Sequence, residues 1–148
     1  MVLFVIVITE IEVHGVLAEL QRATHATLNA LAASLAELSL TGSEQNVLAA
    51  LADGQTRSVG ELANATGTKP STLTSVLDRL ERRGQLERDV DYTDRRSVLI
   101  RLTPAGRWTA AKVREAIKDL EKNALKGISK QPLAGFFTVT LALAEAVK

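Results

Sequence analysis

The fold is decided by residues 70–102, which read PSTLTSVLDRLERRGQLERDVDYTDRRSVLIRL. In the first half the apolar residues recur every three or four positions. This spacing predicts an amphipathic helix that begins at Pro70, where a proline costs no hydrogen bond. After Gly84 the period falls to two, and two short strands, one beginning at Leu86 and one near Val98, flank a turn at residues 91–94. The stretch therefore predicts a helix followed by a β-hairpin.

Two helix starts can be read upstream of this stretch. Thr41 and Glu44 form the pattern of a capping box, in which a hydroxyl and a carboxylate satisfy the first free amides of a helix. The pattern predicts a helix over residues 45–52. Ser58 and Glu61 repeat it and predict a second helix over residues 61–65, with Gly67 as its left-handed end.

Longer helices are expected on both sides. An apolar seam with steps of three and four predicts one long helix before residue 39, and it consists of Val13, Leu17, Leu20, Thr24, Leu28, Leu31, Leu35 and Leu38. Thr103 and Pro104 open another helix after the hairpin, and a last helix is expected after Pro132. A helix whose seam has little nearby sequence to cover it is often buried by another subunit.

This order is typical of a mainly α protein with a small β-wing, a winged helix-turn-helix. We expect an N-terminal dimerisation helix over residues 1–38 and a DNA-binding lobe over residues 39–103. Residues 104–148 are expected to form C-terminal helices that complete the dimerisation region, with Phe136 and Phe137 in a dimer core.

The composition fits a small globular protein with an uneven charge. The 148 residues carry a formal net charge of +1, and 46% of them are hydrophobic. Residues 1–56 hold one basic side chain against six acidic ones, whereas residues 57–107 hold ten against seven. The basic residues of the middle segment are bunched where a nucleic-acid surface would lie.

The helix from Pro70 has two different sides. Leu73, Val76, Leu77 and Leu80 fall on one side and would hold the helix to the lobe. The opposite side predicts a recognition surface of short hydroxyls and arginines: Ser71, Thr72, Thr74, Ser75, Arg79 and Arg82. Hydroxyls near a helix N-terminus can approach base edges and phosphates, and arginine can reach a guanine edge. An ordinary solvated helix would show the same division.

The tip of the hairpin, residues 91–97, carries Asp94, Arg95 and Arg96. Arginine at the end of a ribbon suits the negative potential of a narrow minor groove. Asp94 could hold the guanidinium of Arg96 in a fixed pose. A solvated charged turn is the alternative, but a basic turn so close to the helix above favours a DNA-binding wing.

The chain resembles the MarR family of regulators. The resemblance is carried by LTGSE at 40–44, ELA at 61–63, LDRLERRG at 77–84, DRRS at 94–97 and LTPAG at 102–106. It implies a homodimer docked through its first and last helices on a palindromic operator of double-stranded DNA. It also implies a minor-groove role for Arg96, supported by Asp94, and repression as the common mode of regulation, while the sequence itself does not exclude activation.

Regulators of this kind are often released by small aromatic or anionic effectors. For such a site we name His14, Arg22, His25 and Trp108 as candidates, since they include the two histidines and the first cation of the chain. The competing interpretation places the histidines on the surface or at a dimer rim, and Trp108 in the core.

Several other classes are not supported. No nucleophile-elbow, nucleotide-binding or zinc-hydrolase motif is found, so we expect no enzyme and no cofactor. Cysteine is absent and there are two histidines, which argues against a metal site. The apolar start at residues 1–8 lacks a basic segment and cannot span a bilayer, so we expect a cytoplasmic protein. The remaining alternative is a winged helix that binds proteins without specific DNA binding.

Overall fold

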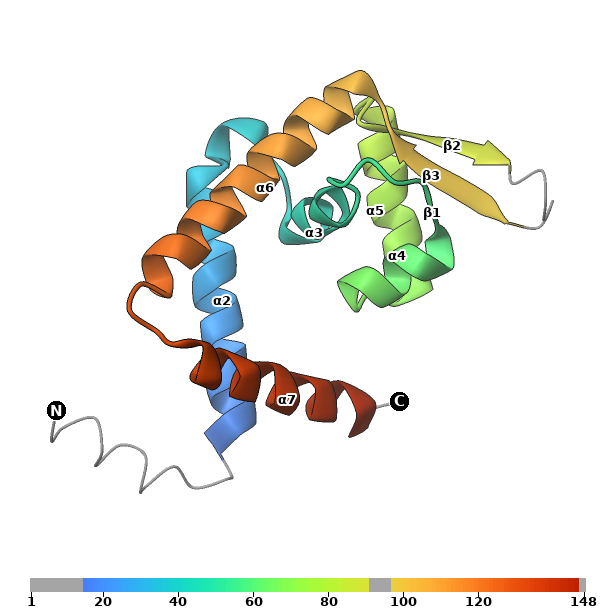
Figure 1. Cartoon of the computed structure of the whole chain (residues 1–148). Helices are drawn as coiled ribbons and strands as arrows, with labels where there is room; N and C mark the ends of the chain where they lie inside the picture. Colours follow the sequence, from blue (N-terminus) through green and yellow to red (C-terminus); the bar gives the residue numbers. More distant parts are fainter. Residues whose placement is uncertain (1–14, 91–96, 147–148) are drawn as a thin grey trace, which may run out of the picture. The chain divides into compact units, whose positions relative to one another are not determined.

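The computed structural model describes residues 15–90 and 97–146. The elements follow in the order α2 (Val16–Ser34), the 3-10 turn η2 (Ala36–Leu38), α3 (Gly42–Ala50), β1 (Arg57–Ser58), α4 (Val59–Thr66), α5 (Pro70–Arg82), β2 (Leu86–Val90), β3 (Val98–Leu102), α6 (Pro104–Ala124) and α7 (Lys130–Ala146) (Figure 1). This order confirms the predicted winged helix-turn-helix. The chain divides into two compact units, Met1–Ile117 and Lys118–Lys148, and the division falls within α6.

Both predicted capping boxes are present. Thr41 accepts from the backbone of Glu44, whose carboxylate accepts from the Thr41 amide, and Ser58 and Glu61 repeat this reciprocal pair. The helices begin directly after these caps, at Gly42 and Val59, so the starts expected at residues 45 and 61 were placed too late. Gly67 ends α4 in the left-handed conformation, as predicted.

The sheet has three antiparallel strands in the order β1-β3-β2. In the hairpin, Leu86 lies opposite Leu102 and Val90 lies opposite Val98. The strand β1 was not predicted, because two residues are too few to show an alternation. It pairs Arg57 with Ile100 and gives β3 a neighbour on both sides.

A single apolar core holds the first unit together. Its buried members come from the loops that follow α2 and η2, from the region of α3 to α5, from the sheet and from α6: Leu35, Leu40, Val47, Leu48, Leu51, Leu62, Ala63, Leu73, Val76, Leu77, Leu80, Leu86, Ile100, Leu102, Ala110 and Val113. Four of them are the predicted apolar stripe of α5. The core therefore fixes α5 from one side and leaves its other side open.

The connection between the hairpin and α6 is unusually close. Thr103 donates its backbone N–H to the carbonyl oxygen of Gln85 (3.1 Å) and its hydroxyl to that of Gly84 (2.6 Å). The Gly106 N–H donates to the Thr103 hydroxyl (3.0 Å). A Cβ atom on Gly106 would lie 1.7 Å from the Gln85 carbonyl oxygen, so glycine is required for this approach.

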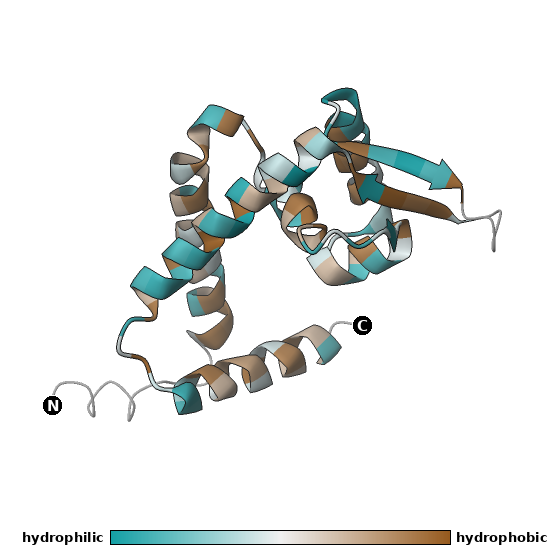
Figure 2. Ribbon diagram, turned by 45° about the horizontal axis from the view of Figure 1, so that its top comes forward, coloured by the Kyte–Doolittle hydropathy of each residue, from teal (hydrophilic) through white to brown (hydrophobic). Residues whose placement is uncertain are grey.

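The helices α2 and α7 are largely exposed to solvent. No residue of α2 (Val16–Ser34) or α7 (Lys130–Ala146) is buried. Figure 2 shows apolar residues along much of α7, and four of its large hydrophobic side chains are exposed: Phe136, Phe137, Val139 and Leu141. The helix α7 begins at Lys130, before Pro132, so that proline lies in its first turn rather than ahead of it.

Candidate nucleic-acid interface

The helix α5 presents the polar face that the sequence predicted. Pro70 opens the helix, and Leu73, Val76, Leu77 and Leu80 are buried. On the other side the hydroxyl residues Ser71, Thr72, Thr74 and Ser75 and the guanidinium residue Arg82 are exposed. Since the buried stripe fixes the rotation of the helix about its axis, these side chains form a defined outer face.

The hydroxyls of this face are partly ordered by their own helix. Thr74 donates to the carbonyl oxygen of Pro70 (3.0 Å), and Ser75 donates to that of Thr72 (2.8 Å). A hydroxyl that donates to its helix keeps its lone pairs available as acceptors. Arg82 donates its Nε to the carbonyl oxygen of Asp78 (3.2 Å), which leaves the end of its guanidinium toward solvent.

Arg79 is held differently from the other candidates. Its Nε donates to Oε1 of Glu44 at 3.1 Å, across 35 positions of the sequence. Its side chain is 40% exposed, whereas that of Glu44 is 3% exposed. Arg79 therefore ties α5 to the start of α3, and a contact from it to DNA stays a prediction.

Glu44 is the centre of a small charged cluster. Its Oε2 accepts the backbone N–H of Thr41 (2.8 Å) and lies 3.8 Å from Nη1 of Arg83. Burial raises the pKa of Glu44. The Thr41 amide, the Arg79 guanidinium and the Thr41 hydroxyl together outweigh that effect, so its pKa lies below the usual value. The carboxylate is thus charged and neutralised from two directions.

Arg83 extends this cluster to the end of η2. Its two terminal nitrogens donate to the carbonyl oxygens of Ser39 (3.0 Å) and Leu38 (2.7 Å). Ser39 adopts a left-handed backbone conformation (φ 48°), which is uncommon for a residue other than glycine. Arg83 therefore holds a tight turn between η2 and α3 from the end of α5.

A second ionic cluster joins α5 to the hairpin. Arg88 of β2 donates its Nη2 to Oδ1 of Asp78 (2.6 Å) and its Nη1 to Oε2 of Glu81. The carboxylate of Asp78 is therefore turned to β2. No local pattern indicates this contact, because Arg88 lies beyond the turn at Gly84.

The wing candidates Asp94, Arg95 and Arg96 lie outside the described residues. The strands that lead to them are described up to Val90 and from Ser97. Val90 and Val98 are 52% and 39% exposed, so the hairpin leaves the core before this point. The role of the wing in DNA binding stays a prediction.

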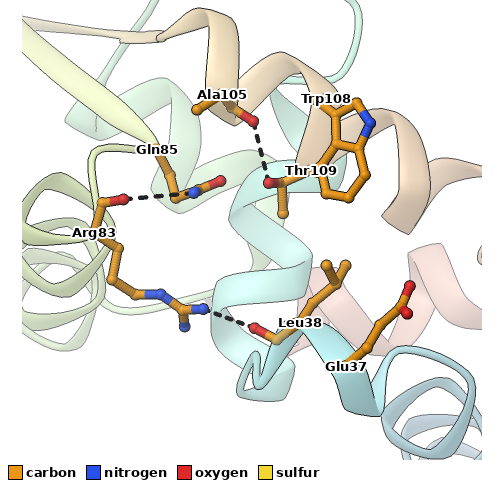
Figure 3. Close-up of a pocket in the computed structure, with 7 residues that line it drawn as sticks. All are labelled: Glu37, Leu38, Arg83, Gln85, Ala105, Trp108 and Thr109. Atoms are coloured by element: carbon orange, nitrogen blue, oxygen red, sulfur yellow. Dashed lines mark hydrogen bonds between the residues drawn. The ribbon is translucent and has the colours of Figure 1, made fainter.

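A pocket of about 420 Å³ lies next to these clusters (Figure 3). Its walls come from η2, the end of α5, the following turn and the start of α6: Glu37, Leu38, Arg83, Gln85, Ala105, Trp108 and Thr109. Trp108 is 58% exposed, so the interpretation that placed it in the core was wrong. Oε1 of Gln85 is buried without a hydrogen-bond partner among the described residues.

Neither Arg22 nor His25 lines this pocket. Arg22 forms an ion pair with Glu19 on the exposed surface of α2, and His25 is also exposed there. His14 lies outside the described residues. Of the three candidates that the structure describes, Trp108 alone lines the pocket, and Arg83 and Gln85 are lining residues that the sequence did not single out for this site.

Residues 15–90 and 97–146 hold no group of three or more His, Cys, Asp or Glu side chains placed to bind a metal ion. In the same part of the chain, no helix combines the length and the apolar character needed to cross a membrane.

The arrangement of α3 to α5 with the β2–β3 hairpin defines a winged helix-turn-helix protein. Residues 38–97 match the model of the MarR family. This segment, which holds α3 to α5 and β2, is therefore similar to the MarR family of transcriptional regulators.

Several solved structures share this fold. BpsR of Bordetella bronchiseptica, whose DNA binding is regulated by 6-hydroxynicotinic acid, is 26% identical, with 90% of this chain and 98% of that one covered and a TM-score of 0.69. MepR of S. aureus in its DNA-binding conformation is 18% identical, with coverages of 88% and 97% and a TM-score of 0.79. The regulator BldR of Sulfolobus solfataricus is 24% identical, with coverages of 86% and 93% and a TM-score of 0.74.

Proposed function

We propose that this protein is a ligand-responsive repressor that binds a palindromic operator as a homodimer in the cytoplasm. In this proposal α5 enters the major groove of double-stranded DNA, and the wing at residues 91–97 enters the minor groove. One observation carries it: α5 exposes four hydroxyl side chains and Arg82 on the side opposite its buried stripe. A helix with one buried apolar side and one exposed polar side can contact DNA while it stays packed against the core.

The terminal helices support the homodimer. Seventeen residues of α7 and nineteen of α2 include none that is buried in the isolated chain. Phe136 and Phe137 are 52% and 62% exposed, and Leu17 is 57% exposed. Large apolar side chains gathered on a surface usually mark a protein interface. A second copy of the chain is the proposed occupant, and one α5 would then meet each half-site.

The pocket beside Trp108 supports control by a small molecule. It offers an aromatic ring and the guanidinium of Arg83, which suits a small aromatic or anionic effector. The same guanidinium binds the carbonyls of Leu38 and Ser39. A ligand that drew Arg83 away would loosen the link between η2 and α5, and so affect the DNA-binding helix. The regulation of BpsR by 6-hydroxynicotinic acid gives a precedent for such a ligand in a protein of similar fold.

The proposal is tested by titrating the purified protein against duplex DNA from its own promoter region. Fluorescence anisotropy at two salt concentrations, beside a scrambled duplex of equal length, separates specific from general binding. We expect tight binding that prefers the promoter and falls steeply with salt, because neutralised phosphates release counterions. Transcription of the adjacent gene in the presence of the protein then distinguishes a repressor from an activator.

Two outcomes would contradict the proposal. Equal and weak binding to both duplexes would exclude a specific operator at that promoter. The absence of binding at low salt would exclude the DNA function and would favour a winged helix that binds proteins.

A further inference from the structure

The starting observation is the position of Arg88 between two carboxylates of another element. Asp78 and Glu81 lie three residues apart on α5, so they occupy neighbouring places on one side of the helix. Arg88 of β2 donates one terminal nitrogen to each. Its side chain is 26% exposed, and the carboxylates of Asp78 and Glu81 are 49% and 40% exposed.

Stability alone does not account for this arrangement. Ion pairs that remain partly exposed contribute little to the free energy of unfolding, at most about 1 kcal/mol each. Arginine differs from lysine because its planar, rigid guanidinium can address two acceptors in fixed directions. A bridge from one guanidinium to two side chains of a helix therefore defines an orientation more than it adds stability.

The position along β2 makes that orientation matter. Leu86 is buried in the core, and Arg88 follows it on the same side of the strand. Val90, the next residue on that side, is 52% exposed. Within the described residues, Arg88 is thus the outermost side chain on that side of β2 to be paired with α5. It is the last of these described contacts with α5 before the strand leaves the lobe.

Charge gives the cluster a second effect. Two carboxylates on a helix that approaches DNA would repel the phosphates and each other. Arg88 brings one positive charge against these two negative charges. Its removal would leave both carboxylates without this counter-charge beside the DNA-facing helix.

We propose that Arg88 is a positioning residue that fixes the angle between α5 and the β2–β3 hairpin. This angle would let α5 enter the major groove while the hairpin reaches the minor groove. The proposal rests on the proposed function for its consequence in DNA recognition. The angle itself is a property of the protein without DNA, and this allows the two ideas to be tested separately.

The first experiment measures the angle without DNA. The chain contains no cysteine, so Thr72→Cys on α5 and Asp89→Cys on β2 provide the only two spin-labelling sites of each subunit. Double electron–electron resonance spectroscopy then gives the distribution of distances between the two spin labels in the full chain. We expect the distribution to be narrow with Arg88 in place and clearly broader with Arg88→Lys, which keeps the charge but loses the rigid fork.

The second experiment measures recognition in the unlabelled protein. We expect Arg88→Lys to weaken promoter binding by about tenfold and binding to scrambled DNA by less than about twofold, with little change in Tm. Arg101→Lys is the matched control, because Arg101 of β3 pairs with Glu87 inside the hairpin (2.9 Å) rather than with α5. It should leave both the distance distribution and the promoter preference unchanged.

The outcomes separate the two proposals. A distribution that stays equally narrow in Arg88→Lys would overturn the positioning role, whatever the DNA measurements show. A broader distribution with an unchanged promoter preference would refute its part in recognition. If the wild-type protein itself shows no promoter preference, the proposed function fails, and the width of the distribution alone decides the role of Arg88.

Discussion

The sharpest structural prediction concerns Gly106 at the start of α6. A Cβ atom added there would lie 1.7 Å from the carbonyl oxygen of Gln85 and 2.7 Å from its carbonyl carbon. Both obstacles belong to the backbone, so no side chain can turn away to make room. The first turn of α6 and the turn at Gln85 would have to separate by at least about 1.3 Å before the contact became tolerable.

The cost of Gly106→Ala follows from this separation. Overpacking of a rigid region costs about 1–3 kcal/mol, and the absence of a yielding side chain places this site at the upper end. The hydrogen bond from Thr103 to Gln85 would also be lost or stretched, at about 1 kcal/mol. The better helix propensity of alanine returns up to about 1 kcal/mol. The net loss is about 3 kcal/mol, or a fall in Tm of about 6–12 °C.

Thermal unfolding followed by circular dichroism measures this loss, at one fixed protein concentration because a dimer's Tm depends on it. Gly60→Ala is the matched control, since Gly60 also lies near the start of a helix, α4, and a Cβ there meets nothing within 4 Å. We expect the control to be unchanged or slightly stabilised. A Gly106→Ala protein that unfolds within about 2 °C of the wild type would refute the close approach on which the reasoning rests.

Three further predictions test the buried carboxylate, the dimer and the wing. Glu44→Gln should cost about 1–2 kcal/mol at neutral pH. The pKa of Glu44 is lowered in the folded protein, so its contribution is complete above about pH 4.5 and is lost as the pH falls through the lowered value. Urea unfolding should therefore depend less on acid pH in the variant, and an unchanged acid dependence would contradict this. Phe137→Glu should shift the protein toward the monomer in sedimentation, and a dimer of undiminished stability would argue against α7 as an interface. Arg96→Ala should weaken promoter binding by roughly 1–3 kcal/mol in a folded protein, and equal affinity would remove the minor-groove role.

Much of the fold could be predicted because its signals are local. Each capping box lies within four residues, Pro70 and Gly67 mark helix ends by their own backbone preferences, and the change of period after Gly84 is visible in a short window. These features depend on hydrogen bonds and dihedral angles near the residue itself. For the same reason, the apolar stripe of α5 identified its buried side correctly.

The ionic clusters could not be predicted in this way. Glu44 was recognised as a helix cap. Its second partner, Arg79, lies 35 positions away in the sequence, and no sequence pattern indicates that the two side chains are in contact. Arg88 likewise meets Asp78 only because the hairpin folds back along α5. Arg79, which was expected to point toward DNA, is held by Glu44 instead.

The pocket shows the same limit. Trp108 lines a pocket, but the companions expected beside it came from one helix, whereas the lining joins four segments. The exposure of the Trp108 side chain could not be predicted either, because a single tryptophan on an amphipathic helix is more often buried. Only the packing of α6 against the turn at Gln85 decides where its ring lies.

The three-stranded sheet has a consequence for the behaviour of the protein at high concentration. A hairpin that leaves the lobe exposes backbone groups along its edges, and such edges can recruit strands from other molecules. Here one edge strand, β1, is two residues long, and the other, β2, carries the charged run Glu87, Arg88 and Asp89. Neither offers a long, flat, apolar template. The hairpin can therefore be extended toward a partner in a crowded cell with little tendency to nucleate aggregation.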